Sequence, residues 1–444
     1  MDNLLPQYDI TTWFYLSLLL IVAIYFRFTR FWSLRNLDLG LLLAFSPALL
    51  VLTEAPDLGN AWLFTAAGVL LVRLLVDGLF TRRPKLEQNL NSPGLAFLGA
   101  CAILFLAMRA TESPPDSTIN TVKRSENLRN RVDDSETRGP EAGPTPSIII
   151  TPVGAISEAV TPPQSEAEEG RMQAAVVTAR VMAVLSHLAI VSALYVLGLR
   201  LFGDPHAGLA MALLHLLLPC TFYQASEVIH VLPSALILWA LVAWRRPVIS
   251  GGLLGLACGT LFFPVFLLPL WAAFYGRRNA LRFLGAFAVV GCVLVASLAF
   301  TSSSAASFVE QVLGTIDWAE LSFRFHIDSE FWSDEDNAVR FPLGVAFFVG
   351  LIFLTIWPRK KSLEYLISAS TAIIVATQFW YPQQGGVYLM WYLPLMLVVV
   401  FRPRLPQYAP EFPPASNQKK SDAPPPPAAP KAVGSATATH ALFR

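Results

Sequence analysis

The sequence of 444 residues is 54% apolar and only 14% charged, whereas a soluble protein carries about 25% charged residues. Its net charge of +1 gives no reason to expect a nucleic-acid partner. The cysteines lie in apolar runs without a CxxC pair, which excludes a disulfide framework and a cysteine zinc site. The composition predicts an all-α polytopic protein whose partner is a lipid bilayer.

Twelve apolar stretches are candidate membrane spans, since a helix needs about 20 apolar residues to cross a bilayer. We expect the first to be retained, because the ten residues before it carry two aspartates and no basic residue, unlike a cleavable signal. The stretches cover residues 11–28, 37–53, 60–80, 93–109, 174–199, 206–223, 229–244, 250–275, 281–301, 341–357, 362–380 and 386–402.

The short loops give the orientation. Loops 54–59 and 224–228 contain acids and no lysine or arginine. The opposite loops are basic, with Arg27, Arg30 and Arg35 after the first span, Arg82, Arg83 and Lys85 after the third, Arg245 and Arg246 after the seventh, and Arg359, Lys360 and Lys361 after the tenth. Because basic loops stay in the cytoplasm, we expect a multi-pass protein of the cell inner (plasma) membrane, with its N-terminus outside and its C-terminus cytoplasmic.

The run 250–275 interrupts this alternation, because basic residues stand on both sides of it. Arg245 and Arg246 precede it, and Arg277, Arg278 and Arg282 follow. Pro264 lies at its centre, where proline breaks a helix. We therefore predict two short arms that enter and leave from the cytoplasm, buried inside the protein. Gly251, Gly255 and Gly259 have the small-xxx-small spacing of closely packed helices.

The spans divide the chain into a front section, residues 1–109, and a back section, residues 173–402. Residues 110–172 between them are rich in Ser, Thr, Pro and Glu, and we expect an external disordered linker. Residues 302–340 combine helically spaced apolar residues with acids, which predicts an external amphipathic segment. Residues 403–444 are rich in Pro and Ala and are predicted to be a disordered cytoplasmic tail.

Ionisable residues inside spans are functional candidates, because burying them is costly. Arg73 and Asp77 stand four residues apart on one helix face, where an ion pair that stabilises the fold is the simplest interpretation. His187 and His215 fall near mid-membrane on adjacent spans, and they would be close if those helices pack. A hydrogen bond between helices is favoured over a proton relay or a metal site.

Three polar groups could meet on the outer face. They are Glu54 with Asp57, then Gln224 with Glu227 and His230, and an acidic set formed by Asp317, Glu320, His326, Asp328, Glu330, Asp334 and Asp336. A carboxylate there could act as general base toward a hydroxyl, or hold a divalent cation beside a phosphate. The simpler alternative is that these acids are solvated residues of the outer surface and have no catalytic role. We assign no metal ligands, and the cofactor stays unknown apart from this possible divalent cation.

The last predicted external stretch, residues 378–391, is unusually rich in aromatic and amide side chains. Aromatic residues collect at membrane interfaces, but aromatic faces with amide donors also suit sugar rings. The residues that would contact a sugar are Trp380, Gln383, Gln384, Tyr388 and Trp391.

Motifs punctuated by Gly, Pro and Arg run through the back section. Arg180 opens a span that closes with Tyr195 to Gly203, and Leu218-Pro219 stands near the end of the next. After these come Trp239 to Pro247, Gly251 to Ala257, Phe263-Pro264, Leu268-Pro269-Leu270 and finally Tyr381 to Pro394. Over about half the chain this series resembles the polytopic glycosyltransferases of the GT-C superfamily, particularly the bacterial mannosyltransferase-like branch.

The resemblance implies a GT-C fold and a membrane enzyme that moves a sugar from a polyprenyl-phosphate donor to an extracytoplasmic acceptor. Members of the superfamily usually carry a catalytic aspartate in the first external loop, but the first loop here is basic and internal. Glu54 or Asp57 is then the nearest equivalent as base, with Glu227 and His230 assisting. Arg180, Arg245 and Arg246 are expected near the lipid carrier.

Two other functions stay open. Phe262 or Phe263 replaces a lysine that often stands beside the proline of the broken helix in the superfamily, which would suit a non-catalytic scaffold or a degenerate relative. A transporter or flippase would use the broken helix and the mid-membrane histidines as its pathway, and internal inverted repeats should accompany that function. The sequence shows no such repeats.

Overall fold

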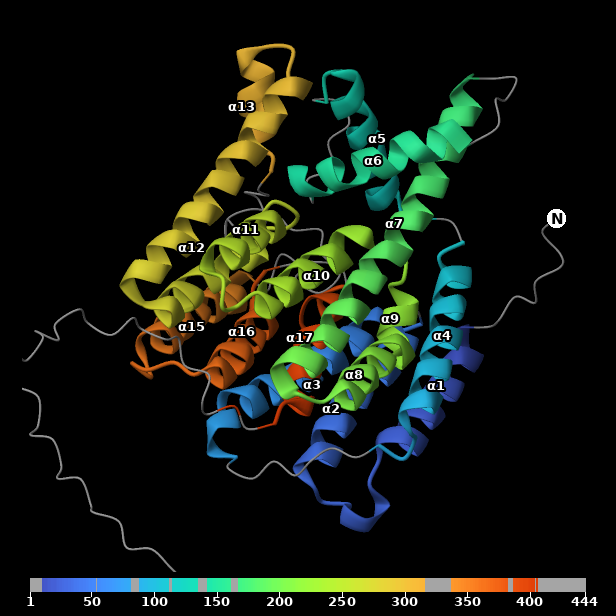
Figure 1. The fold of residues 1–444 in the computed structure, drawn as a ribbon, viewed down its shortest axis with the longest axis vertical. Coiled ribbons are helices and arrows are strands. Elements are labelled where there is room, and N and C mark those ends of the chain that lie inside the picture. Colours follow the sequence, from blue (N-terminus) through green and yellow to red (C-terminus); the bar gives the residue numbers. More distant parts are fainter. Residues whose placement is uncertain are drawn as a thin grey trace, which may run out of the picture. The chain divides into compact units, whose positions relative to one another are not determined.

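The computed structural model describes residues 10–52, 54–80, 88–111, 114–134, 142–160, 167–315, 337–381, 386–403 and 405. These residues form an all-α structure without strands (Figure 1). Within these described ranges, six helices are long and apolar enough to cross a membrane, and six shorter apolar helices accompany them. Eleven of the predicted spans each correspond to one of these helices, and the stretch 250–275 contains α11 (Pro247–Cys258) and the start of α12 (Leu268–Leu298). The chain is therefore a multi-pass membrane protein.

The front section contains α1 (Ile10–Tyr25), α2 (Leu34–Leu52), α3 (Pro56–Leu75) and α4 (Ser92–Arg109). The back section begins with α7 (Ala167–Leu197), α8 (Pro205–Leu217), α9 (Pro219–Tyr223), α10 (Val228–Val242) and α11 (Pro247–Cys258). It continues with α12 (Leu268–Leu298), α15 (Asn337–Ile356), α16 (Leu363–Thr377) and α17 (Tyr388–Phe401). Proline stands in the first turn of α3, α8, α9 and α11, where its missing N–H costs nothing.

The predicted hairpin at 250–275 is confirmed. Its first arm is α11, its bend contains the short helix η4 (Phe263–Leu267), and its second arm is the start of α12, which ends at Gly276 with φ 68° and ψ 170°. The Tyr275 hydroxyl donates a hydrogen bond to the Trp244 carbonyl at 2.7 Å. The two arms therefore begin and finish at the same end of the bundle, next to both basic clusters.

The remainder of α12 runs parallel to α11, and the glycines of α11 permit the contact. A Cβ on Gly251 would lie 2.1 Å from the Phe283 carbonyl oxygen, and one on Gly259 would lie 2.4 Å from Leu294 Cδ1. A Cβ on Gly255, which stands between these two glycines, would lie 3.2 Å from Val290 Cβ. The predicted packing role of the small-xxx-small spacing is thus confirmed.

Two ends of the bundle can be named from the hairpin. The tip end holds Gly259 and Thr260 at the bend, and the basic end holds Arg245, Arg246 and Arg277. The outer face predicted from the loops corresponds to the tip end.

Residues 110–172 differ from the disordered linker that their composition predicted. They contain α5 (Asp116–Asn130) and α6 (Pro144–Val160), which lie together near the top of Figure 1. The buried Arg124 guanidinium donates to Asp134 at 2.8 Å and to the Ala142 carbonyl at 2.7 Å. A polar composition was compatible with order here because the polar groups satisfy one another.

This folded segment also holds the hairpin bend. The Gly143 N–H donates to the Thr260 carbonyl at 3.0 Å, and the Thr145 N–H donates to the Gly259 carbonyl at 2.9 Å. The two backbone bonds satisfy carbonyls that the bend would otherwise leave without partners. Residues 143–145 therefore fix the position of the bend.

The amphipathic segment predicted at 302–340 is seen in part. It begins with α13 (Ala305–Leu313), capped by the Ser304 hydroxyl, which accepts from the Ser307 N–H at 3.1 Å. The acidic set from Asp317 to Asp336 lies outside the described residues, as do nearly all residues of the predicted tail.

The front and back sections share one core. α3 packs against α16, α4 against α8, and α2 against α17. The predicted Arg73–Asp77 ion pair is confirmed at 2.8 Å and belongs to a larger buried network. Arg73 also pairs with Asp38 at 2.6 Å, Arg402 pairs with Asp77, and Arg402 reaches Glu364 at 3.1 Å. This network joins α2, α3, α16 and the residue that follows α17.

Candidate functional site

The residues singled out from the sequence separate into two groups at opposite ends of α10. Glu227 precedes this helix and His230 lies in its first turn, whereas Arg245 and Arg246 follow its last turn. A helix of 15 residues is about 22 Å long. One phosphate group therefore cannot contact both groups, and the prediction that Arg245 and Arg246 contact a lipid carrier requires a second site at the basic end.

At the tip end, His230 is held by Trp391. The indole Nε1–H donates to Nδ1 of His230 at 3.1 Å, and the two ring planes lie 22° apart. Since Nδ1 accepts this bond, Nε2 carries the hydrogen in neutral His230. His230 in this state is a hydrogen-bond donor toward a ligand oxygen, which differs from the role of a base.

The hairpin supports the same pair. Phe263, beside the bend, stacks on Trp391 with ring centroids 4.3 Å apart and planes at 9°. Trp391 is 1% exposed, so neither ring face is open to a sugar. The sequence predicted a sugar contact for Trp391, whereas in the structure its indole contacts His230 and Phe263.

Trp380 belongs to a second aromatic group with Phe266, Phe347 and Phe348, all within 5.7 Å of its centroid. It is also 1% exposed, and its carbonyl accepts a 2.7 Å bond from Nε of the fully buried Arg340. Tyr388 donates its hydroxyl to the Tyr381 carbonyl at 2.5 Å. Gln383 and Gln384, predicted beside these residues, lie outside the described part of the chain.

The loop before α10 carries Gln224 and Glu227 and is anchored by two histidines. His187 Nε2 donates to the Ala225 carbonyl at 3.2 Å, and His215 Nε2 lies 3.4 Å from His187 Nδ1. The predicted proximity of His187 and His215 is confirmed. A chain of hydrogen bonds from His215 through His187 to Ala225 explains both imidazoles as neutral side chains that link two helices to this loop.

Glu227 itself accepts a hydrogen bond from the Ser117 hydroxyl at 3.4 Å, and the Thr118 hydroxyl donates to the Ser226 carbonyl at 3.1 Å. Both donors belong to α5. The segment that was predicted to be a disordered linker thus helps to place a predicted site residue.

Glu54 and Asp57 are exposed at the tip end, in and after the turn between α2 and α3. Gly386 connects this region to the rest of the site, because a Cβ on it would lie 2.9 Å from Leu49 Cδ2 and 3.4 Å from Gln224 Nε2. The end of α2, the loop before α10 and the start of α17 therefore meet at one place.

The membrane helices α4, α7 and α15 carry Arg109, Arg180 and Arg340 at the tip end, where the distribution of charge in the loops predicts few cations. Arg180 stands seven residues before His187 on the same face of α7, and a helix brings residues at this spacing into line. Arg109 lies over the Phe222 ring at 5.6 Å, and Arg340 lies beside Trp380. The sequence analysis selected Arg180 but missed Arg109 and Arg340, although a cation at the outer end of a span was a usable signal.

Among the residues that the structure describes, no group of three His, Cys, Asp or Glu side chains could hold a metal ion. The predicted acidic set is outside those residues, so the possible divalent cation stays a prediction.

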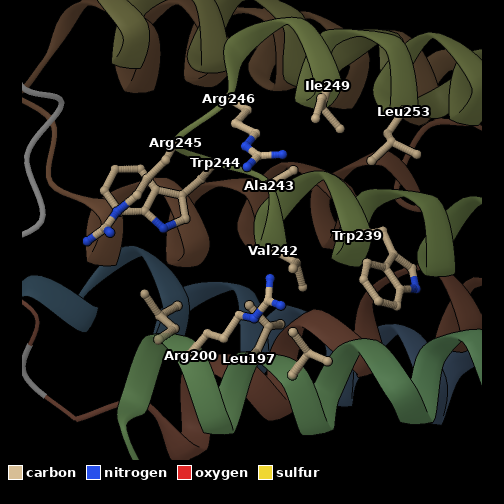
Figure 2. Close-up of a pocket in the computed structure, with 12 residues that line it drawn as sticks. Leu197, Arg200, Trp239, Val242, Ala243, Trp244, Arg245, Arg246, Ile249 and Leu253 are labelled. Atoms are coloured by element: carbon tan, nitrogen blue, oxygen red, sulfur yellow. The ribbon is translucent and has the colours of Figure 1, made fainter.

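A separate pocket of about 420 Å³ lies at the basic end (Figure 2). It is lined by Val196, Leu197, Arg200, Leu201, Trp239, Val242, Ala243, Trp244, Arg245, Arg246, Ile249 and Leu253. Arg245 and Arg246 thus take part in a site that does not include the residues of the tip end.

Residues 171–381 match the model of glycosyltransferase family 87. The match covers about half the chain and contains most of the motifs that carried the GT-C resemblance. No curated protein and no solved structure matches the sequence.

Proposed function

Because the chain belongs, through residues 171–381, to glycosyltransferase family 87, a polytopic membrane family of the GT-C type, we propose that it transfers a sugar from a polyprenyl phosphate to an extracytoplasmic acceptor. The observation that carries the proposal is the convergence at the tip end. The end of α2, which leads into the turn with Glu54, meets the loop before α10 and the start of α17 there, beside the buried His230–Trp391 pair.

In this proposal Asp57 or Glu54 takes the proton from the acceptor hydroxyl. A bond forms between the acceptor oxygen and the anomeric carbon of the sugar, while the bond from that carbon to the phosphate oxygen breaks. Polyprenyl phosphate leaves with an additional negative charge. A cation near that oxygen stabilises the charge as it develops.

Arg180 is the proposed contact for the leaving phosphate, because a guanidinium can donate two parallel bonds to phosphate oxygens. His230, with its hydrogen on Nε2, can donate one more. Glu227 stands three residues before His230, and its carbonyl accepts from the His230 N–H at 3.1 Å. We propose that its side chain hydrogen-bonds an acceptor hydroxyl. Trp380, Tyr388 and Trp391 fix the wall of the site rather than stack on the sugar.

The test is sugar transfer by the purified full-length protein in nanodiscs, with a panel of polyprenyl-phosphate sugars. Wild type is compared with Asp57→Ala, Glu54→Ala and the control Asp116→Ala. Asp116 is an exposed acid in the first turn of α5, as Asp57 is in the first turn of α3, so the control removes a similar charge from the same end.

We expect transfer to be lost in Asp57→Ala or Glu54→Ala and kept in Asp116→Ala, with unchanged thermal unfolding in all three. Absence of transfer by wild type with every donor in the panel would contradict the proposal. Equal transfer by wild type and both variants would remove these two acids from the mechanism.

A further inference from the structure

The pocket at the basic end is formed where three elements finish or begin. The end of α7, the end of α10 and the start of α11 surround it, and the loop 243–246 closes one side. Its lining residues Trp239 and Val242 lie about 14 and 18 Å along α10 from His230. It is therefore a site separate from the proposed sugar-transfer site.

Two guanidinium groups enter this pocket from opposite walls. Figure 2 shows Arg246 reaching in from the start of α11 and Arg200 from the end of α7, while Arg245 turns away beside Trp244. Arg245 lies over the Trp244 ring at 5.2 Å. No acidic side chain among the described residues pairs with Arg200 or Arg246. Asp204, close in sequence to Arg200, accepts instead from the His206 and Ala207 N–H groups.

The backbone around both arginines is specialised. Arg200 lies in η3 (Gly198–Phe202), a π-helical turn, and such turns occur often at functional sites. Arg246 is the N-cap of α11, whose first backbone N–H groups have no acceptor within the helix. The positive end of that helix dipole adds to the two side-chain charges. The pocket thus favours an anion.

The rest of the pocket lining, away from the two arginines, is mostly apolar. Leu197, Trp239 and Leu253 line the pocket from membrane helices, and the Trp239 Nε1–H is already engaged with the Ala189 carbonyl at 3.1 Å. Val248 and Ile249, at the start of α11, are exposed large apolar residues. A ligand here meets charge at its head and hydrocarbon beside it.

We propose that this pocket binds the phosphate headgroup of an anionic phospholipid from the leaflet at the basic end. Arg200 and Arg246 contact the phosphate oxygens, and the acyl chains lie along Val248 and Ile249. Basic pockets between membrane helices on the cytoplasmic side recognise anionic headgroups in this way. A free inorganic anion has no hydrocarbon surface that could pack against the apolar walls of the pocket.

A polyprenyl phosphate has the same head chemistry, and the test separates the two lipids. Full-length protein in detergent is titrated with phosphatidylglycerol, cardiolipin, phosphatidylcholine or undecaprenyl phosphate, and bound lipid is counted by native mass spectrometry. Wild type is compared with Arg200→Gln/Arg246→Gln. The control, Arg359→Gln/Lys360→Gln, removes the same charge from an exposed loop outside the pocket.

We expect the pocket variant to bind phosphatidylglycerol or cardiolipin at least about tenfold more weakly, with the control Arg359→Gln/Lys360→Gln close to wild type. Equal weakening in the control would show a general charge effect and overturn the proposal. Selective loss of undecaprenyl phosphate alone would overturn it as well, in favour of a carrier site. Because lipid binding is measured without sugar transfer, the result is independent of the proposed enzymatic function.

Discussion

Trp391 donates its indole N–H to His230 while it stacks on Phe263, so one side chain connects the imidazole to the bend of the hairpin. All three rings are buried. At the tip end the hairpin therefore packs against the ring that donates a hydrogen bond to His230.

Replacing Trp391 with Phe keeps an aromatic ring against Phe263 and removes the donor to His230. We expect about a fivefold fall in kcat, since a neutral hydrogen bond contributes about 1 kcal/mol, with little change in KM for the donor. The measurement is steady-state transfer in nanodiscs. A normal kcat in Trp391→Phe would show that the bond has no part in catalysis, and an equal loss of folded protein would assign it to stability.

The link from His187 to Ala225 gives a second prediction. His187→Phe removes the donor to the Ala225 carbonyl and the acceptor for His215. We expect a loss of stability of about 1–3 kcal/mol, because buried polar groups are left without partners. Thermal unfolding of His187→Phe/His215→Phe should show partial recovery, since both imidazoles are then absent. Additive losses in the double variant would argue against a coupled pair.

The buried ion network around Arg73 gives a third prediction. Arg73→Met leaves Asp38 and Asp77 without their shared partner, and breaking a buried pair costs about 3–5 kcal/mol. We expect low yield and early unfolding, measured by fluorescence-detected gel filtration after heating. Arg359→Met, at an exposed position, is the matched control and should behave as wild type. A normal Arg73→Met profile would contradict a structural role.

A fourth prediction concerns the contact between residues 143–145 and the bend. A Cβ on Gly143 would lie 2.3 Å from the Gly259 carbonyl oxygen, so Gly143→Ala should cost about 1–3 kcal/mol. Gly154→Ala is the control, because its Cβ would meet nothing closer than 3.9 Å and alanine favours a helix. Limited proteolysis and thermal unfolding measure both. Similar behaviour of the two variants would mean that the bend does not depend on this contact.

Local patterns were sufficient to predict much of the fold. The twelve spans follow from apolar runs, and the hairpin follows from two basic clusters with Pro264 between them. The Arg73–Asp77 pair and the His187–His215 contact follow from helical spacing and from adjacent spans. Each of these features depends on residues that are close in sequence or on neighbouring helices.

Contacts between distant segments were not predicted. Arg402, which follows α17, joins Asp77 from 325 positions further along the chain, and no spacing rule connects the two residues. The order of α5 and α6 depends on Asp134, on Ala142 and on the carbonyls of the hairpin bend. Composition could not reveal it, because the polar groups acquire their partners only in the folded chain.

The residue types of the candidate site were predictable from the sequence, but which of these residues lie together was not. The sequence predicted that Arg245 and Arg246 lie in a cytoplasmic loop and that Asp57 lies on the outer face, but it did not reveal that the two arginines line a pocket of their own. It also gave Trp391 a sugar-binding role, since aromatic content reveals nothing about burial.

The return of the hairpin to its own end has a topological consequence. Because its two arms together make no net crossing, α15, α16 and α17 keep the direction that they would have if residues 247–276 were absent. The hairpin could be gained or lost as a unit without inverting any helix downstream, whereas loss of a single arm would invert the remainder of α12 together with α15, α16 and α17. Selection would accept variation in the length of both arms together, and would reject changes that separate one arm from the other.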